Sequence, residues 1–166
     1  FEFLKELEEG HTLEGYLFPS TYEVYKISKE EDIISKMLTQ FEEIYNNEIR
    51  DRLKEMKLDL NEAVTLASII EREGKLDEER PIISAVFHNR LNIGMKLQSC
   101  ATVQYILGER KEVLSTADTK IPSPYNTYIN IGLPPAPIAS PGKVSLIAAV
   151  KPEDVDYLFF VLTGED

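Results

Sequence analysis

The sequence predicts an α+β domain, with a helical body, a small β-sheet and a long proline-rich loop that lines a cleft. Apolar residues recur at helical spacing through much of the chain between residues 28 and 108. The segments "STYEVY" (20–25) and "YLFFVL" (157–162) are rich in aromatic and β-branched residues, which is typical of strands. Residues 121–142 hold six of the nine prolines and therefore indicate irregular structure.

The composition is that of a single globular domain. The chain has 166 residues, of which 43% are hydrophobic and 28% are charged, so it can bury a core. Its net charge of -11, without a basic cluster, argues against a nucleic-acid partner. The densest apolar runs, 145–150 and 157–162, are far shorter than the ~18 residues of a membrane helix.

A long amphipathic helix is expected within residues 26–56. Ser28 and Glu31 have the spacing of a capping box. Apolar side chains follow at Ile34, Met37, Leu38, Phe41, Ile44 and Tyr45. The charged residues between them predict a solvated outer face.

A second helix is expected from Asp59 to the terminating Gly74. Its apolar stripe consists of Ala63, Leu66, Ala67 and Ile70. At about 100° per residue, Glu71 lies at the margin of this stripe, and Glu73 lies about 200° further round. A regular helix therefore cannot turn both acids towards one cleft.

Three more helices are expected further along, and the loop before the last of them is informative. They cover 77–94, with Pro81 in the first turn, then 101–108 and 141–150. Prolines restrict the backbone, so residues 121–142 predict a stiff, shaped loop inside the domain. An inter-domain linker is the alternative.

Glu71 is the best candidate for chemistry. A carboxyl group that borders apolar side chains is partly shielded from water, which suits a general acid. The alternative is a structural glutamate paired with Arg72, Arg80 or Arg90. A glycoside hydrolase would also need a second carboxylate, and Glu14, Glu62 and Asp118 are the candidates, with nothing in the sequence to place them near Glu71.

Other catalytic constellations are not apparent in the sequence. His11 and His88 have no third ligand at metal spacing, so no metal or cofactor is expected. Cys100 has no evident base nearby, and its flanking residues are typical of a buried small residue. The sequence lacks a nucleophile elbow, a P-loop and a dinucleotide fingerprint.

Neutral polar and aromatic residues are concentrated after residue 97, a composition that suits a sugar ligand. They are Gln98, Ser99, Gln104, Tyr105, Ser123, Tyr125, Asn126, Thr127 and Tyr128. Ordinary loop packing is an equally good explanation of these residues.

Five segments stand out as motifs: "LEGYLFPSTYEV" (13–24), "ASIIEREG" (67–74), "SAVFHNRLNIGMKLQS" (84–99), "SPYNTY" (123–128) and "GLPPAPIASPG" (132–142). In order and spacing, they resemble the YceG-like (MltG) endolytic murein transglycosylases. The sequence departs from the family at Cys100 and Ala101, where many members have Asp-Pro.

The resemblance implies a lytic transglycosylase, in which Glu71 is the single catalytic acid and base. It implies cleavage of the bond between N-acetylmuramic acid and N-acetylglucosamine in peptidoglycan, leaving 1,6-anhydromuramic ends and requiring no cofactor. Gln98, Ser99, Ser123, Tyr125 and Asn126 are carried over as substrate-binding residues. A hydrolase and a non-catalytic wall-binding module are the alternatives.

The resemblance also implies an organisation for the full-length protein. Residues 1–12 are expected to be the tail of an upstream module, and 13–166 the catalytic domain with a truncated carboxyl end. Family members carry an amino-terminal membrane helix, so the protein is expected at the extracytoplasmic face of a bacterial membrane. Its expected partners are glycan strands, with cell-wall synthases as further candidates.

Overall fold

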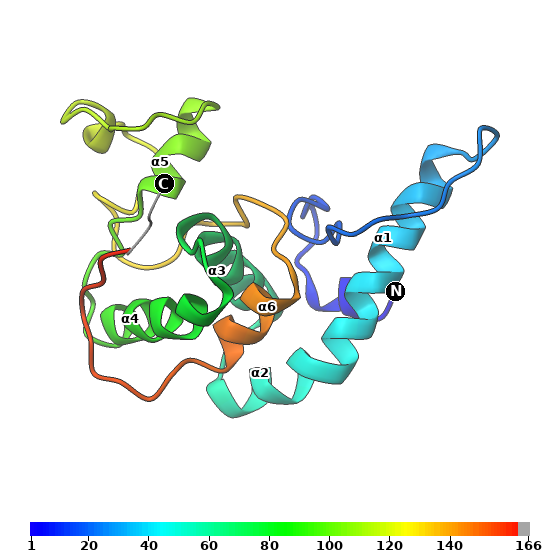
Figure 1. The fold of residues 1–166 in the computed structure, drawn as a ribbon, viewed down its shortest axis with the longest axis horizontal. Helices are drawn as coiled ribbons and strands as arrows, with labels where there is room; N and C mark the ends of the chain where they lie inside the picture. The colour runs from blue at the N-terminus through cyan, green and yellow to red at the C-terminus, as the bar shows by residue number, and fades with distance from the viewer. Residues whose placement is uncertain (163–166) are drawn as a thin grey trace.

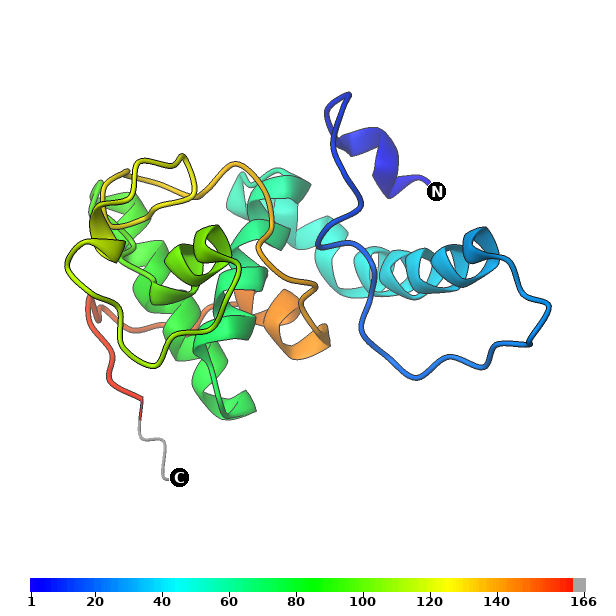
Figure 2. The ribbon, with the colours of Figure 1, turned by 90° about the horizontal axis from the view of Figure 1, so that it is seen from above.

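The computed structural model describes residues 1–162 and shows a helical domain. Its α-helices are α1 (Glu30–Ile44), α2 (Arg50–Met56), α3 (Leu60–Glu73), α4 (Arg80–Asn92), α5 (Cys100–Leu107) and α6 (Lys143–Val150). Short 3-10 turns cover Phe3–Glu6, Asp77–Glu79 and Asp118–Lys120. α1 and the amino-terminal segments lie on one side, and α3 to α6 form the body on the other (Figure 1, Figure 2).

The predicted β-sheet is wrong, because residues 1–162 contain no strand. Residues 157–162 do alternate as a strand would, with Tyr157, Phe159 and Val161 exposed and the residues between them half-buried. Side chains of α4 replace a partner strand here. Asn89 donates to the carbonyls of residues 155 and 157 at 2.9 Å, and Arg90 Nε donates to that of residue 158 at 2.7 Å.

The other predicted strand, 20–25, is an irregular segment without a β partner in the described residues. It lies beside α1, where the Lys36 ammonium donates to the Glu23 carbonyl. The composition of both segments favours strands, but a sheet also requires a second segment at hydrogen-bonding distance.

The long helix predicted within 26–56 is present with two differences. It begins at Glu30, where Asp32 accepts a hydrogen bond from the Lys29 backbone N–H at 3.1 Å, and Ser28 is not its cap. A π-helical turn, Tyr45–Ile49, also separates α1 from α2. The turn keeps Tyr45 and Ile49 buried across the change in helical phase.

α3 is the central helix, and its predicted ends are confirmed. Asp59 accepts from the Glu62 N–H at 2.7 Å, and Glu62 accepts from the Asp59 N–H at 3.0 Å, forming a capping box. Every residue from 63 to 70 is buried, because α4, α5, α6 and the proline-rich loop surround this helix. The polar surface of α3 is therefore confined to its ends.

The amino-terminal segment belongs to the core of the described structure. The ring of Phe3 is fully buried and lies 4.8 Å from Phe41 and 5.9 Å from Tyr16, measured between ring centroids. The prediction that residues 1–12 are the tail of an upstream module stays a prediction.

The proline-rich loop is bonded to the body at several points, as a shaped loop would be. Asn61 Nδ2 donates to the Pro135 carbonyl at 2.9 Å, and Ile138 N–H donates to Ser68 Oγ at 3.0 Å. Gly15, with φ +95°, comes so close that a Cβ would lie 2.4 Å from the Pro137 Cβ. Only glycine fits this contact between "LEGY" and the loop.

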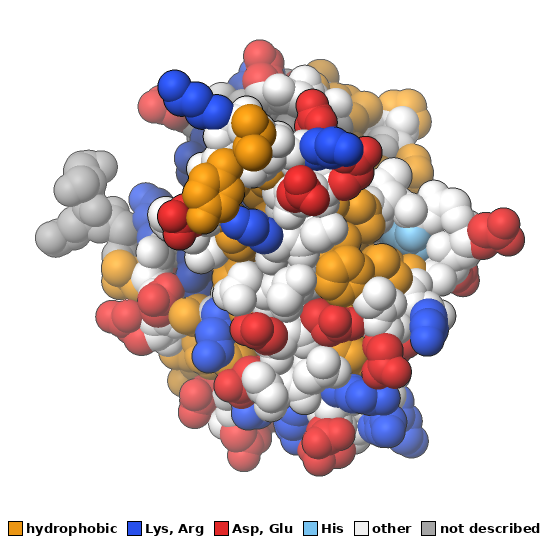
Figure 3. Space-filling model, turned by 90° about the vertical axis from the view of Figure 1, so that its right-hand side faces the viewer, with side chains coloured by type: hydrophobic (Ala, Val, Ile, Leu, Met, Phe, Trp, Pro, Cys, Tyr) orange, Lys and Arg blue, Asp and Glu red, His pale blue; other side chains and the backbone are white. Residues whose placement is uncertain are grey.

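The surface is mixed in charge. On the face of Figure 3, acidic and basic side chains alternate with exposed apolar groups. Within residues 1–162, no helix has the length and apolar character needed to cross a membrane.

Candidate active site

Glu71 lies in the last turn of α3, directly after the buried run of residues 63–70. Its side chain is 26% exposed, so the carboxylate is neither in bulk water nor enclosed. The position at the margin of the core that the helical spacing predicts is therefore the one observed.

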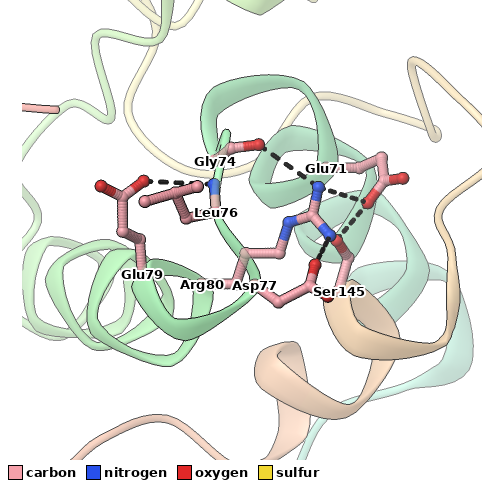
Figure 4. Close-up of polar contacts among 7 residues, drawn as sticks. All are labelled: Glu71, Gly74, Leu76, Asp77, Glu79, Arg80 and Ser145. Atoms are coloured by element: carbon pink, nitrogen blue, oxygen red, sulfur yellow. Dashed lines mark hydrogen bonds and ion pairs between the residues drawn. The ribbon is translucent and has the colours of Figure 1, made fainter. Parts of the chain in front are cut away.

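Two groups hold one oxygen of Glu71 (Figure 4). Ser145 Oγ, fully buried in the first turns of α6, donates to Oε2. Arg80 Nη2, from the start of α4, lies 3.4 Å from the same oxygen. The other oxygen, Oε1, has no hydrogen-bond partner among residues 1–162.

Gly74 makes the contact with Arg80 possible. A Cβ at residue 74 would lie 2.8 Å from Arg80 Cγ and 3.2 Å from Arg80 Nε, closer than side chains pack. The backbone of Gly74 has an ordinary φ of -79°, so space and not backbone conformation requires glycine here. The end of "ASIIEREG" is shaped to let the guanidinium cross to Glu71.

The ion pair between Glu71 and Arg80 is not exclusive, because Arg80 also contacts two other groups. Arg80 Nη1 lies 2.8 Å from Asp77 Oδ1, nearer than its approach to Glu71, and Nη2 also donates to the Gly74 carbonyl at 3.3 Å. The charge of Arg80 is therefore partly balanced by Asp77, and Glu71 is not its sole partner. Of the three arginines considered from the sequence, Arg80 alone contacts Glu71.

The end of the proline-rich loop borders the free oxygen. A Cβ at Gly142 would lie 3.5 Å from Glu71 Oε1, so the loop brings its backbone beside this atom. Glycine at this position leaves the space next to Oε1 open.

Glu73 has a different environment, although it is only two residues away. Its Oε1 accepts from Ser99 Oγ at 2.5 Å and from the Ala101 N–H at 3.4 Å. The carboxylate therefore caps the amino-terminal end of α5, where negative charge is stabilised. As the spacing predicted, Glu71 and Glu73 do not face one site.

The three candidates for a second carboxylate are engaged elsewhere. Glu14 accepts from Tyr105 Oη at 2.9 Å, and Glu62 belongs to the α3 capping box. A hydrogen bond from Lys111, with further ones from Ser115, lowers the pKa of Asp118 to about 2, so this group is a carboxylate at neutral pH. Asp77, held by Arg80, is the carboxylate that the contacts connect to Glu71.

The predicted substrate-binding residues do not share one environment. Gln98 is exposed and has a left-handed backbone with φ 50°, a strained conformation often found at binding sites. Ser99 is buried and donates to Glu73, and Asn126 is fully buried, donating to the carbonyls of residues 119 and 121. Neither buried side chain has a free surface to offer a ligand.

Ser123 and Tyr125 are half-buried in the proline-rich loop. Ser123 Oγ accepts from the Tyr125 N–H at 3.2 Å, and the Tyr125 ring lies 4.9 Å from that of Tyr105. None of the five predicted substrate-binding residues hydrogen-bonds to Glu71 in residues 1–162.

Two residues that could have been reactive have other surroundings. Cys100 is exposed, with its Sγ 3.0 Å from Tyr128 Oη, so the expectation of a buried small residue is wrong.

His88 Nε2 is 2.7 Å from the Ala149 carbonyl and ties α4 to the end of α6. Burial lowers the pKa of His88, which keeps the ring neutral as the donor in this contact.

The sequence profile of the YceG-like family matches residues 2–166. The chain belongs to the YceG-like family. This confirms the resemblance that the five motifs indicated.

Relatives in the YceG-like family support this membership along nearly the whole chain. An endolytic murein transglycosylase of Bacillus subtilis is 42% identical over 152 residues, covering 91% of this chain and 42% of the relative. Another, from Streptococcus pneumoniae strain R6, is 37% identical over 166 residues, covering 95% and 29%. The chain therefore spans less than half the length of these two proteins.

A solved structure shows the same fold. A YceG-like protein from Listeria monocytogenes superposes with a TM-score of 0.85 at 40% identity, over 95% of this chain and 53% of that one. At this identity the likeness covers sequence as well as fold.

Sequence reasoning missed Ser145 and left Arg80 as one of several choices. The signal for Ser145 was a hydroxyl in an otherwise apolar helix, "VSLIAAV". A buried polar side chain needs a partner, and here the partner is Glu71, 74 residues away.

Proposed function

We propose that this chain is the catalytic domain of an endolytic lytic transglycosylase that cleaves peptidoglycan glycan strands. The observation that supports this proposal most directly is the arrangement at Glu71. Ser145 and Arg80 hold its Oε2, while its Oε1 has no hydrogen-bond partner in residues 1–162. The relatives at 37–42% identity, named endolytic murein transglycosylases, support the same activity.

In this proposal Glu71 acts twice. It first donates a proton to the glycosidic oxygen, and the bond between that oxygen and C1 of muramic acid breaks. The Glu71 carboxylate then accepts the proton of the muramic acid 6-hydroxyl, as the oxygen of that hydroxyl attacks C1. The product is a 1,6-anhydro ring, and no water is consumed.

One carboxylate is sufficient because the nucleophile belongs to the substrate. Holding the 6-hydroxyl near C1 replaces the second carboxylate that a hydrolase requires. Glu14, Glu62, Glu73 and Asp118 are already committed to other contacts, which supports a mechanism with a single acid. Anchoring of Oε2 supplies the fixed orientation that proton transfer requires.

Mass spectrometry of the products tests the proposal. Glycan strands incubated with the protein should yield fragments with 1,6-anhydromuramic ends, and Glu71→Gln should yield none. Reducing ends heavier by one water would indicate a hydrolase, with Asp77 as its candidate second carboxylate. Strand binding without new ends would indicate a wall-binding module.

The proposed substrate also implies a location. Peptidoglycan lies outside the cytoplasmic membrane, so we propose that the domain works at the extracytoplasmic face. A membrane anchor elsewhere in the full-length protein, and a partnership with cell-wall synthases, stay predictions.

A further inference from the structure

A groove runs along α5, between this helix, the end of α3 and the 108–112 turn. It consists of two hollows, of about 330 and 640 Å³, which share Arg72, Ala101, Gln104 and Arg110 as lining residues. Gln104 Nε2 donates to the Lys111 carbonyl at 2.8 Å and holds the 108–112 turn as one wall. Because they share four lining residues, the two hollows adjoin, and we describe them together as one groove.

Charged side chains of both signs line the groove, with four cations, Arg72, Lys75, Arg110 and Lys111, and three acids, Glu73, Glu109 and Glu112. Arg72, Lys75 and Arg110 line it, are exposed, and form no ion pair within residues 1–162. Lys111 also lines it but is paired with Asp118 at 2.8 Å. Because the chain carries a net charge of -11, it repels carboxylates except where such cations gather.

The groove lies on the Glu73 side of α3, and Arg72 is the lining residue next to Glu71 in the sequence. Arg72 follows Glu71 directly in the last turn of α3, about 100° further round the helix. An extended peptide of four residues reaches about 14 Å. A peptide attached to a sugar at Glu71 is therefore long enough to reach Arg72, the lining residue next to it.

We infer that this groove binds the peptide stem of the glycan strand, an inference that rests on the proposed function. Stem peptides carry several carboxylates, which guanidinium groups bind in bidentate fashion. They also carry a free amino group, and the exposed acids Glu109 and Glu112 at the groove suit it. A bare glycan would instead require neutral donors and aromatic faces, of which the groove offers only Gln104 and Tyr105.

The first test compares strands that bear stems with the same strands after amidase removal of the stems. The wild-type chain should show a higher kcat/KM for anhydro-end formation on stem-bearing strands. In the double variant Arg72→Ala, Arg110→Ala, that preference should fall about tenfold, and it should also fall as salt increases. Lys26→Ala, Lys29→Ala, which removes two charges from the segment before α1, is the matched control and should keep the preference.

A binding measurement separates this inference from the proposed function. Calorimetry with a soluble stem peptide and the Glu71→Gln chain requires no catalysis. A Kd about tenfold weaker in the Arg72→Ala, Arg110→Ala background supports the groove even if no strand is cleaved. Equal Kd values in both backgrounds, or binding of polyglycerol phosphate but not of the stem peptide, overturn it.

Discussion

The two sides of the last turn of α3 carry the same residue type in opposite roles. Towards α6, Glu71 is held by one oxygen and presents the other. Towards α5, Glu73 accepts through its Oε1 from a hydroxyl and a backbone N–H, and it caps a helix. Each acid has one bonded oxygen, so the difference lies in the partners: an arginine and a serine hold Glu71 beside Gly142, whereas the end of α5 holds Glu73.

The largest effect on activity should come from replacing Glu71 by glutamine, and the same change at Glu73 is the comparison. Glu71→Gln removes the titratable proton and keeps the shape, so we expect at least about a 10³-fold loss of kcat with a nearly unchanged melting temperature. Glu73→Gln weakens a cap and should cost about 1 kcal/mol of unfolding free energy, with far less loss of activity. Similar kinetic losses in both variants, measured by anhydro-end formation, would remove the distinction.

Gly74→Ala should damage the Glu71 side without touching its carboxylate. The added Cβ pushes Arg80 away from Glu71, so we expect about a tenfold loss of kcat and about 1 kcal/mol of stability. Gly94→Ala is the control: its φ of 68° gives a backbone cost of about 1 kcal/mol, but no atom lies within 4 Å of the added carbon, so stability falls without a steric contact. Full activity in Gly74→Ala would show that Arg80 does not position the acid.

Ser145→Ala should remove one of the two anchors of Oε2. A hydrogen bond to a charged group is worth about 1.5 kcal/mol, so kcat should fall about tenfold with KM nearly constant. Ser84→Ala provides the control, since the buried Ser84 hydroxyl has no partner in residues 1–162. An equal kinetic effect of both substitutions would contradict a specific role for Ser145.

The smallest effect concerns how α6, and with it Ser145, is held in place. Burial lowers the pKa of His88 below its ordinary value of 6.5, so the unfolded chain binds the proton more readily. Neutral His88 therefore contributes to the free energy of unfolding above pH 6.5, and this contribution is lost as the pH falls below 6.5. His88→Gln keeps a donor for the Ala149 carbonyl and should flatten that part of the pH dependence in urea unfolding. An unchanged slope would exclude His88 as its source.

Local sequence was sufficient for most helices. The capping box at Asp59 and Glu62, the terminating Gly74 and the proline at residue 81 each act within one or two turns. Helical hydrogen bonds join residues four apart, so these signals lie where they act. The same periodicity placed Glu71 at the edge of the core and separated it from Glu73.

The prediction of a β-sheet was wrong, because a sheet depends on contacts between segments that lie far apart in the sequence. "STYEVY" and "YLFFVL" have the composition of strands, but a strand needs a partner that local sequence does not specify. Within residues 1–162, α4 side chains occupy that place for one segment and α1 lies beside the other. Composition indicates a tendency to form strands and does not specify the neighbouring segment.

By itself, then, the sequence determined the helices, the family and the one carboxylate at the margin of the core, since each depends on spacing along the chain. Only the tertiary structure decided that Arg80 and Ser145 are the anchors of Glu71, that Glu73 belongs to α5, and that Arg72 lines a groove. These outcomes depend on which distant segments pack together. Packing of this kind is set by the whole core, and no short window of sequence contains it.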